Sequence, residues 1–153
     1  EHLAYVRDAL GRGKRIWHYV CNTSPRMPIF EGYRRHAWFG EYHRLTGNQF
    51  FILHDAEGGV GERDWKAPTN GGFVYRSFDE FIPSVRYMSF RRGIYDVKYI
   101  SKLRAVAGDR PEVKTFLETA AKRVVVTEKH DRTAADRVRE EAARLILKYG
   151  GKK

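Results

Sequence analysis

The chain has 153 residues, of which 42% are hydrophobic and 14% aromatic, and this is enough apolar material for one modest core. No apolar run approaches the roughly 20 residues that a helix needs to cross a bilayer, and no signal peptide opens the sequence. Cys21 is the single cysteine, which excludes an intrachain disulfide framework. The composition therefore indicates a globular domain without a membrane span.

The formal net charge of +10 raises the question of a nucleic-acid or other anionic partner. The basic residues are scattered along predicted helices and mixed with Glu and Asp, as in residues 118–144. The sequence has no compact basic run, no zinc-knuckle spacing and no aromatic sheet motif of the usual binding modules. A solvated helical surface explains the charge better, and a small basic nucleic-acid-binding module is the alternative.

Helical and strand-like patterns alternate over the first third of the chain. The apolar spacing of residues 3–10 predicts a short helix. Residues 15–21 and 49–54 are rich in aromatic and β-branched side chains and predict two strands. Residues 33–45, between them, have helical periodicity. Strand, helix and strand in this order predict a βαβ unit, whose two strands are parallel.

The remaining chain predicts one long loop followed by helices. Residues 55–83 have little periodicity, and loops of this length are uncommon unless they are functional. Residues 84–104 predict an amphipathic helix, and residues 111–126 and 132–149 predict two more. We place a boundary after residue 106, so that the C-terminal helices form an extension over 107–153.

Three residues in or next to the 84–104 region lead to specific expectations. Pro83 fits the first turn of the helix, where its missing N–H costs nothing. Gly93 costs about 0.5–1 kcal/mol relative to Ala, so a close approach of this helix to a strand is expected there. Asp96 follows Arg92 by four residues and Arg91 by five, and a local ion pair is favoured over catalysis.

Several of these segments carry ordered motifs. Residues 83–86 read Pro-Ser-x-Arg, and residues 91–99 read Arg-x-Gly-Ile-x-Asp-x-x-Tyr. Residues 17–21 read Trp-x-Tyr-x-Cys, and residues 34–38 read Arg-x-x-x-Trp. In this order they resemble the C-terminal part of the glycoside hydrolase family 123-type catalytic domain, over about residues 14–104. Residues 49–55 match the family's last strand only loosely. In the later motif, Tyr95 replaces the acidic residue that often precedes the family's Asp.

The resemblance implies an α/β fold, namely the C-terminal fragment of a (β/α)8 TIM barrel. Residues 1–106 would supply its last strand–helix units, with two parallel strands and flanking helices. Residues 107–153 would be the C-terminal helical extension. A complete barrel of this kind needs roughly 250 residues, so the missing N-terminal part of the barrel is expected upstream and is itself a partner of this chain.

The resemblance also implies an activity for a full-length parent. Members of the family are similar to N-acetylhexosaminidases that use substrate assistance, with an adjacent Asp-Glu pair near the fourth strand. The pair Asp79-Glu80 does not occupy that position and is expected to cap the following helix or to face solvent. We therefore expect a parent that hydrolyses a carbohydrate substrate with retention, and a chain that is inactive alone, with no catalytic residue, metal or cofactor site. The cellular location stays open, and the extracellular space or the periplasm would suit such a parent.

Side chains at the carboxyl ends of barrel strands point toward the site, and aromatic rings suit sugar faces. Five residues are predicted to reach the substrate on this basis: Tyr19, Asn22, His54, Asp55 and Trp65. His54 and Asp55 are neighbours, so at most one of them faces the pocket unless the strand has already ended. Trp17 is expected to pack in the core instead.

A metal site is the remaining alternative among the motifs. His18, His36, His43 and His54 with Cys21 could be imagined as ligands, but they lack the close paired spacing of zinc motifs. The sequence therefore predicts surface or capping histidines.

Overall fold

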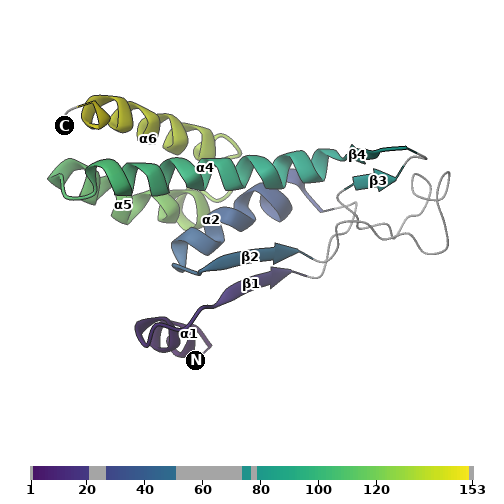
Figure 1. Cartoon of the computed structure of the whole chain (residues 1–153), viewed down its shortest axis with the longest axis horizontal. Helices are drawn as coiled ribbons and strands as arrows, with labels where there is room; N and C mark the ends of the chain where they lie inside the picture. The colour runs from purple at the N-terminus through teal and green to yellow at the C-terminus, as the bar shows by residue number, and fades with distance from the viewer. Residues whose placement is uncertain (1, 21–26, 51–73, 77–78, 152–153) are drawn as a thin grey trace.

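The computed structural model describes residues 2–20, 27–50, 74–76 and 79–151. The fold is mixed α/β and mostly helical (Figure 1). In chain order its elements are α1 (His2–Gly11), β1 (Trp17–Val20), the π-helical turn η1 (Phe30–Arg34), α2 (Arg35–Tyr42), β2 (Gly47–Phe50), β3 (Val74–Arg76), β4 (Phe81–Pro83), α4 (Val85–Ala107), α5 (Pro111–Lys122), the π-helical turn η2 (Arg123–Thr127) and α6 (Ala134–Gly150).

Strands β1 and β2 lie side by side and run parallel, as predicted. Trp17 pairs with Gly47, and Val20 pairs with Phe50. Helix α2 lies between the two strands in the sequence and packs against β2 and α4. This is the arrangement that a βαβ crossover requires. The βαβ unit is therefore confirmed, whereas a barrel remains a prediction.

Strands β3 and β4 form an antiparallel pair within the segment that was predicted to be loop. Pro83 is the last residue of β4, so the prediction that it opens the helix is wrong. Ser84 is the N-cap of α4 instead, and its hydroxyl accepts a hydrogen bond from the backbone N–H of Tyr87. Asp79 and Glu80 are exposed, in agreement with the second of the two expectations for them.

The main core lies among the helices. Trp38 of α2 packs with Ile100 and Leu103 of α4, and these residues are almost completely buried. Val113 of α5 and Val138 of α6 complete the same cluster. One core therefore joins residues on both sides of the boundary predicted after residue 106. Figure 1 shows α6 and the β1–β2 sheet on opposite sides of α4 and α2.

The buried face of α4 changes character along its length. Toward its C-terminus it buries Ile100 and Leu103, whereas its first half buries Arg86, Gly93 and Asp96. Gly93 does mark a close approach, but its neighbour is η1 and not a strand. A Cβ atom on Gly93 would lie 2.2 Å from the backbone carbonyl oxygen of Arg34. The glycine therefore lets η1 and α4 touch through their backbones.

We expect Gly93→Ala to lower the free energy of unfolding by about 1–3 kcal/mol, because backbone atoms must shift to admit the methyl group. The gain in helix propensity, about 0.5–1 kcal/mol, offsets this only in part. Urea denaturation followed by circular dichroism measures the change. Gly11→Ala is the matched control, since a Cβ there would meet nothing within 4 Å. Equal stability of the two variants would contradict the close approach.

Candidate functional site

The predicted substrate residues fall largely outside the described part of the chain. Tyr19 lies on β1, and 49% of its surface is exposed. Asn22, His54, Asp55 and Trp65 lie outside the described residues, so their placement stays a prediction. Among the described residues, Tyr19 is therefore the member of this set that can be placed.

The outward face of the β1–β2 sheet is aromatic. Alternation along the strands puts Trp17, Tyr19 and Gln49 on the face opposite α2, and all three are exposed. Trp17 is 62% exposed, so the prediction of a core tryptophan is wrong for this structure. Its indole lies over Gly47, where a Cβ atom would come within 2.7 Å of the ring. This face therefore exposes two aromatic side chains, Trp17 and Tyr19.

The inward face of the sheet holds a histidine pair. The rings of His18 and His36 lie 4.1 Å apart between centroids, and Phe50 packs on His36 at 4.2 Å. His36 is 5% exposed, so the prediction of surface histidines is wrong for it. Burial and then the charge of His18 lower the pKa of His36 to about 4. Burial and then His43 lower the pKa of His18. Both rings are therefore neutral at pH 7.

The carboxylate of Asp96 in α4 is completely buried. Its Oδ2 atom accepts hydrogen bonds from Arg34 Nε at 2.7 Å and from Trp38 Nε1 at 3.3 Å. Its Oδ1 atom accepts one from Arg139 of α6 at 3.2 Å. Three elements, η1, α2 and α6, are thus tied to one residue of α4.

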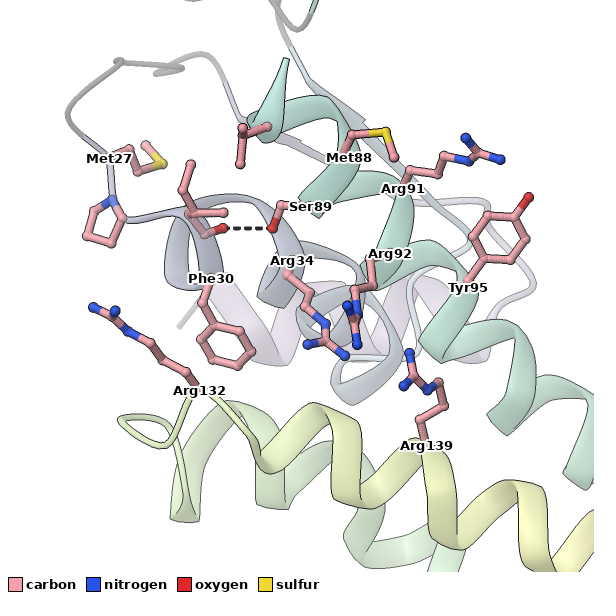
Figure 2. A pocket seen from close by; sticks show the side chains of 13 residues that line it. Met27, Phe30, Arg34, Met88, Ser89, Arg91, Arg92, Tyr95, Arg132 and Arg139 are labelled. Carbon is pink, nitrogen blue, oxygen red and sulfur yellow. Dashed lines mark hydrogen bonds between the residues drawn. The ribbon is translucent and has the colours of Figure 1, made fainter. Parts of the chain in front are cut away.

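Asp136, near the start of α6, is the second carboxylate of this cluster. It accepts two hydrogen bonds from Arg34, at 2.9 and 2.8 Å, and one from Arg92 at 2.7 Å. Arg139 Nη2 lies 3.1 Å from the same carboxylate. Figure 2 shows the guanidinium groups of Arg34, Arg92 and Arg139 side by side. Arg92 therefore pairs with Asp136 rather than with Asp96, and the predicted local ion pair within α4 is wrong. We call these five residues the arginine–aspartate network.

The charges of this network reinforce one another. The hydrogen bonds from Arg34 hold the pKa of Asp136 well below its ordinary range, despite partial burial. Burial lowers the pKa of Arg34, but the bonds and charges of Asp136 and Asp96 outweigh it and raise that pKa above its ordinary value. Asp136 and Arg34 therefore stay ionised at neutral pH. Groups so firmly charged and paired are suited to fixing helices, not to transferring protons.

Sequence reasoning singled out Arg34, Arg92 and Asp96 but not Asp136 or Arg139, and it did not find the pairing of Arg34 with Asp96. Arg34 and Trp38 are four residues apart, so they lie on one face of a helix and can reach a common acceptor. That spacing is the signal that could have predicted a shared carboxylate. Asp96 of α4, the aspartate of the second motif, was the candidate acceptor.

Two searches of the described residues limit other functions. No group of three or more His, Cys, Asp or Glu side chains there could hold a metal ion. No helix in the described ranges is both long and apolar enough to cross a membrane.

Comparison with known proteins gives no further assignment: no family model, no curated protein and no solved structure matches the chain.

We expect Asp96→Ala to lower the free energy of unfolding by about 3–5 kcal/mol, because it leaves the buried guanidinium of Arg34 without one of its two carboxylates. The matched control is Asp8→Ala, which removes an exposed pair with Arg12 and should cost about 0–1 kcal/mol. Urea denaturation measures both. Similar losses for the two variants would show that the network does not stabilise the fold.

His36 predicts a pH dependence of stability. Its folded-state pKa of about 4 lies below the ordinary value of 6.5. As the pH falls below about 6.5, the unfolded chain binds a proton that the folded chain excludes, so stability decreases until the folded state also titrates near pH 4. We expect a loss of about 1–2 kcal/mol between about pH 7 and pH 5.

The pH effect is measured as the difference between the wild type and His36→Phe, which keeps a ring at this position and removes the titration. The exposed His130→Gln is the control and should retain the wild-type pH dependence. An unchanged pH dependence in His36→Phe would refute the assignment. The chemical shift of the His36 ring, followed by NMR, reports its pKa directly.

Proposed function

We propose that the chain is the non-catalytic C-terminal portion of a glycoside hydrolase-like protein, whose full-length parent hydrolyses N-acetylhexosaminides by a substrate-assisted retaining mechanism. The observation that carries this proposal is the meeting of two motifs at one carboxylate. Arg34 and Trp38 form the Arg-x-x-x-Trp motif, and both donate to Asp96 of the Gly-Ile-x-Asp motif.

The two motifs also touch through their backbones. Gly93, three residues before Asp96, lies against the carbonyl group of Arg34. Gly93 and Asp96 of the second motif therefore both contact the first motif. Motif residues that need each other in space support a common structural plan with the resembled family. In that plan these residues hold the last two helices of the barrel wall together, and the chemistry lies elsewhere.

The β1–β2 sheet supports the same proposal. Parallel sheets are normally covered on both faces, because their crossover helices lie on one face and further structure on the other. Here α2 lies on the inward face, while Trp17 and Tyr19 are exposed on the outward face. The proposal assigns that face to the interior of the barrel, which strands from the upstream part would close.

In such a parent the chemical step requires groups that this chain does not supply. One residue of an upstream Asp-Glu pair would orient the substrate acetamido group, whose oxygen attacks the anomeric carbon. The other would protonate the leaving oxygen. Tyr19, at the carboxyl end of β1, would contribute a wall of the sugar pocket.

The test begins with the coding sequence upstream of residue 1. The proposal requires about six strand–helix units and an Asp-Glu pair there. The full-length protein should release the aglycone from a chromogenic N-acetylhexosaminide with retention at the anomeric carbon, and residues 1–153 alone should not. An upstream region without strand–helix units would overturn the proposal.

Replacement of the substrate residues in the full-length protein tests their assignment. For each of Tyr19, His54, Asp55 and Trp65 whose side chain reaches the sugar, we expect replacement by Ala to lower kcat/KM by roughly ten- to a hundredfold, because each lost polar or stacking contact costs about 1–3 kcal/mol. Asn22→Ala belongs to the same set. Tyr5→Ala is the matched control, since Tyr5 lies on α1 with 70% of its surface exposed. Unchanged kinetics in all the pocket variants would leave this chain a purely structural part of the barrel.

The alternative, a nucleic-acid-binding module, receives less support. Several basic side chains are engaged with carboxylates rather than arranged as a free surface, as in Arg104 with Glu41, Arg123 with Glu141, and Arg137 with Glu128. Such pairing neutralises the charge locally. Salt-sensitive binding of the chain to single- or double-stranded nucleic acid would favour this alternative.

A further inference from the structure

A groove of about 970 Å³ borders the arginine–aspartate network. Residues 27–30, the first turns of α4 and the start of α6 form its walls (Figure 2). Tyr19, the described member of the predicted substrate set, does not line it.

One part of the groove is strongly cationic. Five arginines line it, and none of the described residues in its lining is acidic: Arg34, Arg91, Arg92, Arg132 and Arg139. Asp96 and Asp136 bind the guanidinium groups but are not part of the lining. The groove is therefore lined by guanidinium groups, whereas Asp96 and Asp136, which bind three of them, are not part of its lining.

The positive charge here is incompletely balanced. In the arginine–aspartate network, three guanidinium groups share two carboxylates. Arg92 donates to Asp136 from Nη2 alone, so its Nε and Nη1 donors are not used by a carboxylate of the described residues. Among the described residues, the carboxylate that pairs with Arg132 is that of Glu31, whose Oε1 lies 3.9 Å from Arg132 Nε. An anion in the groove would find N–H donors that already point in fixed directions.

The adjoining part of the groove is apolar. Ile29, Val85 and Met88 are 39%, 69% and 49% exposed, and Met27 lies beside them. Figure 2 shows Met27 and Met88 on the side away from α6, while the guanidinium groups of the network lie toward α6. Ser89 fixes one wall to the other by donating a hydrogen bond to the carbonyl oxygen of Ile29. Cationic and apolar surfaces are therefore held next to each other.

We propose that this groove binds a small organic anion, in which one carboxylate, sulfate or phosphate head group is joined to an apolar body. The head group accepts hydrogen bonds from Arg92 and its neighbours, and the body covers Met88 and Ile29. An inorganic anion alone would leave the apolar wall in water. A neutral apolar molecule would remove water from the guanidinium groups without replacing its hydrogen bonds. The proposal goes beyond sugar hydrolysis and does not depend on it.

Three probes, of which the first two share one shape, test the proposal by isothermal titration calorimetry. They are 2-naphthalenesulfonate, its neutral amide 2-naphthalenesulfonamide, and inorganic sulfate. We expect the sulfonate to bind at least about tenfold more tightly than either of the others. Its affinity should fall as the salt concentration rises from about 0.05 to about 0.5 M. The probes 2-naphthoate and 2-naphthyl phosphate then show which head group the site prefers.

Variants locate the binding. Met88→Glu places a carboxylate in the groove and should weaken sulfonate binding by more than about tenfold. Leu147→Glu makes the same kind of change at a residue of α6 that is 82% exposed and does not line the groove, and should have no effect. The double variant Arg91→Gln/Arg132→Gln should weaken binding about three- to tenfold, whereas the exposed Lys102→Gln on α4 should not.

The circular dichroism melt of each variant establishes that it is folded. The double variant changes two exposed side chains, so it keeps the test valid if Met88→Glu fails to fold. Equal affinity for the sulfonate and its neutral amide would overturn the proposal. So would sulfonate binding that Met88→Glu and the double variant both leave intact, because this would place the ligand on another surface, such as the one formed by Trp17 and Tyr19.

Discussion

The fold depends on the buried carboxylate of Asp96. A carboxylate that is fully removed from water is tolerated only when it is paired and hydrogen-bonded. Asp96 obtains its partners from η1, α2 and α6, so α4 can be buried only when these elements are in place. Gly93 adds a steric condition, since the backbone of η1 must come close enough for Arg34 to reach the carboxylate. The same contact that satisfies one charge thus sets the spacing of the helical layer.

The arrangement also explains why a cationic groove forms. Arg34 is almost fully buried and needs two carboxylates, which brings Asp136 of α6 toward η1. Arg92 and Arg139 then gather around Asp136, so the network holds more positive than negative groups. The excess charge lies on the solvent side, where water or an anion can reach it. The pairing of the buried Arg34 with two carboxylates therefore also gathers the arginines that make the groove cationic.

The sequence predicted what local patterns determine and missed what distant contacts determine. The βαβ order, the parallel pairing and the long helix α4 all follow from periodicity and strand composition, and the structure confirms them. The partner of Asp96 could not be predicted from these patterns. The local rule for residues four apart selected Arg92, whereas the folded chain buries Arg34, 62 residues away in the sequence, against Asp96. Gly93 was correctly identified as a close contact but assigned to the wrong neighbour for the same reason. Trp17 was wrongly assigned to the core, since alternation along a strand shows which residues share a face but not which face is covered.

Helix α6, which contributes to the groove, and the β1–β2 sheet lie on opposite sides of the layer formed by α2 and α4 (Figure 1). The outward face of the β1–β2 sheet is aromatic and nearly uncharged, which suits the uncharged rings of a sugar or the interior of a barrel. The groove toward α6 is cationic beside an apolar wall, which suits an amphiphilic anion. Arg34 connects them, because its backbone belongs to the turn that precedes α2 while its guanidinium group borders the groove. An anion bound by Arg92 and Arg139 would balance the excess positive charge at two residues that also join α4 to α6.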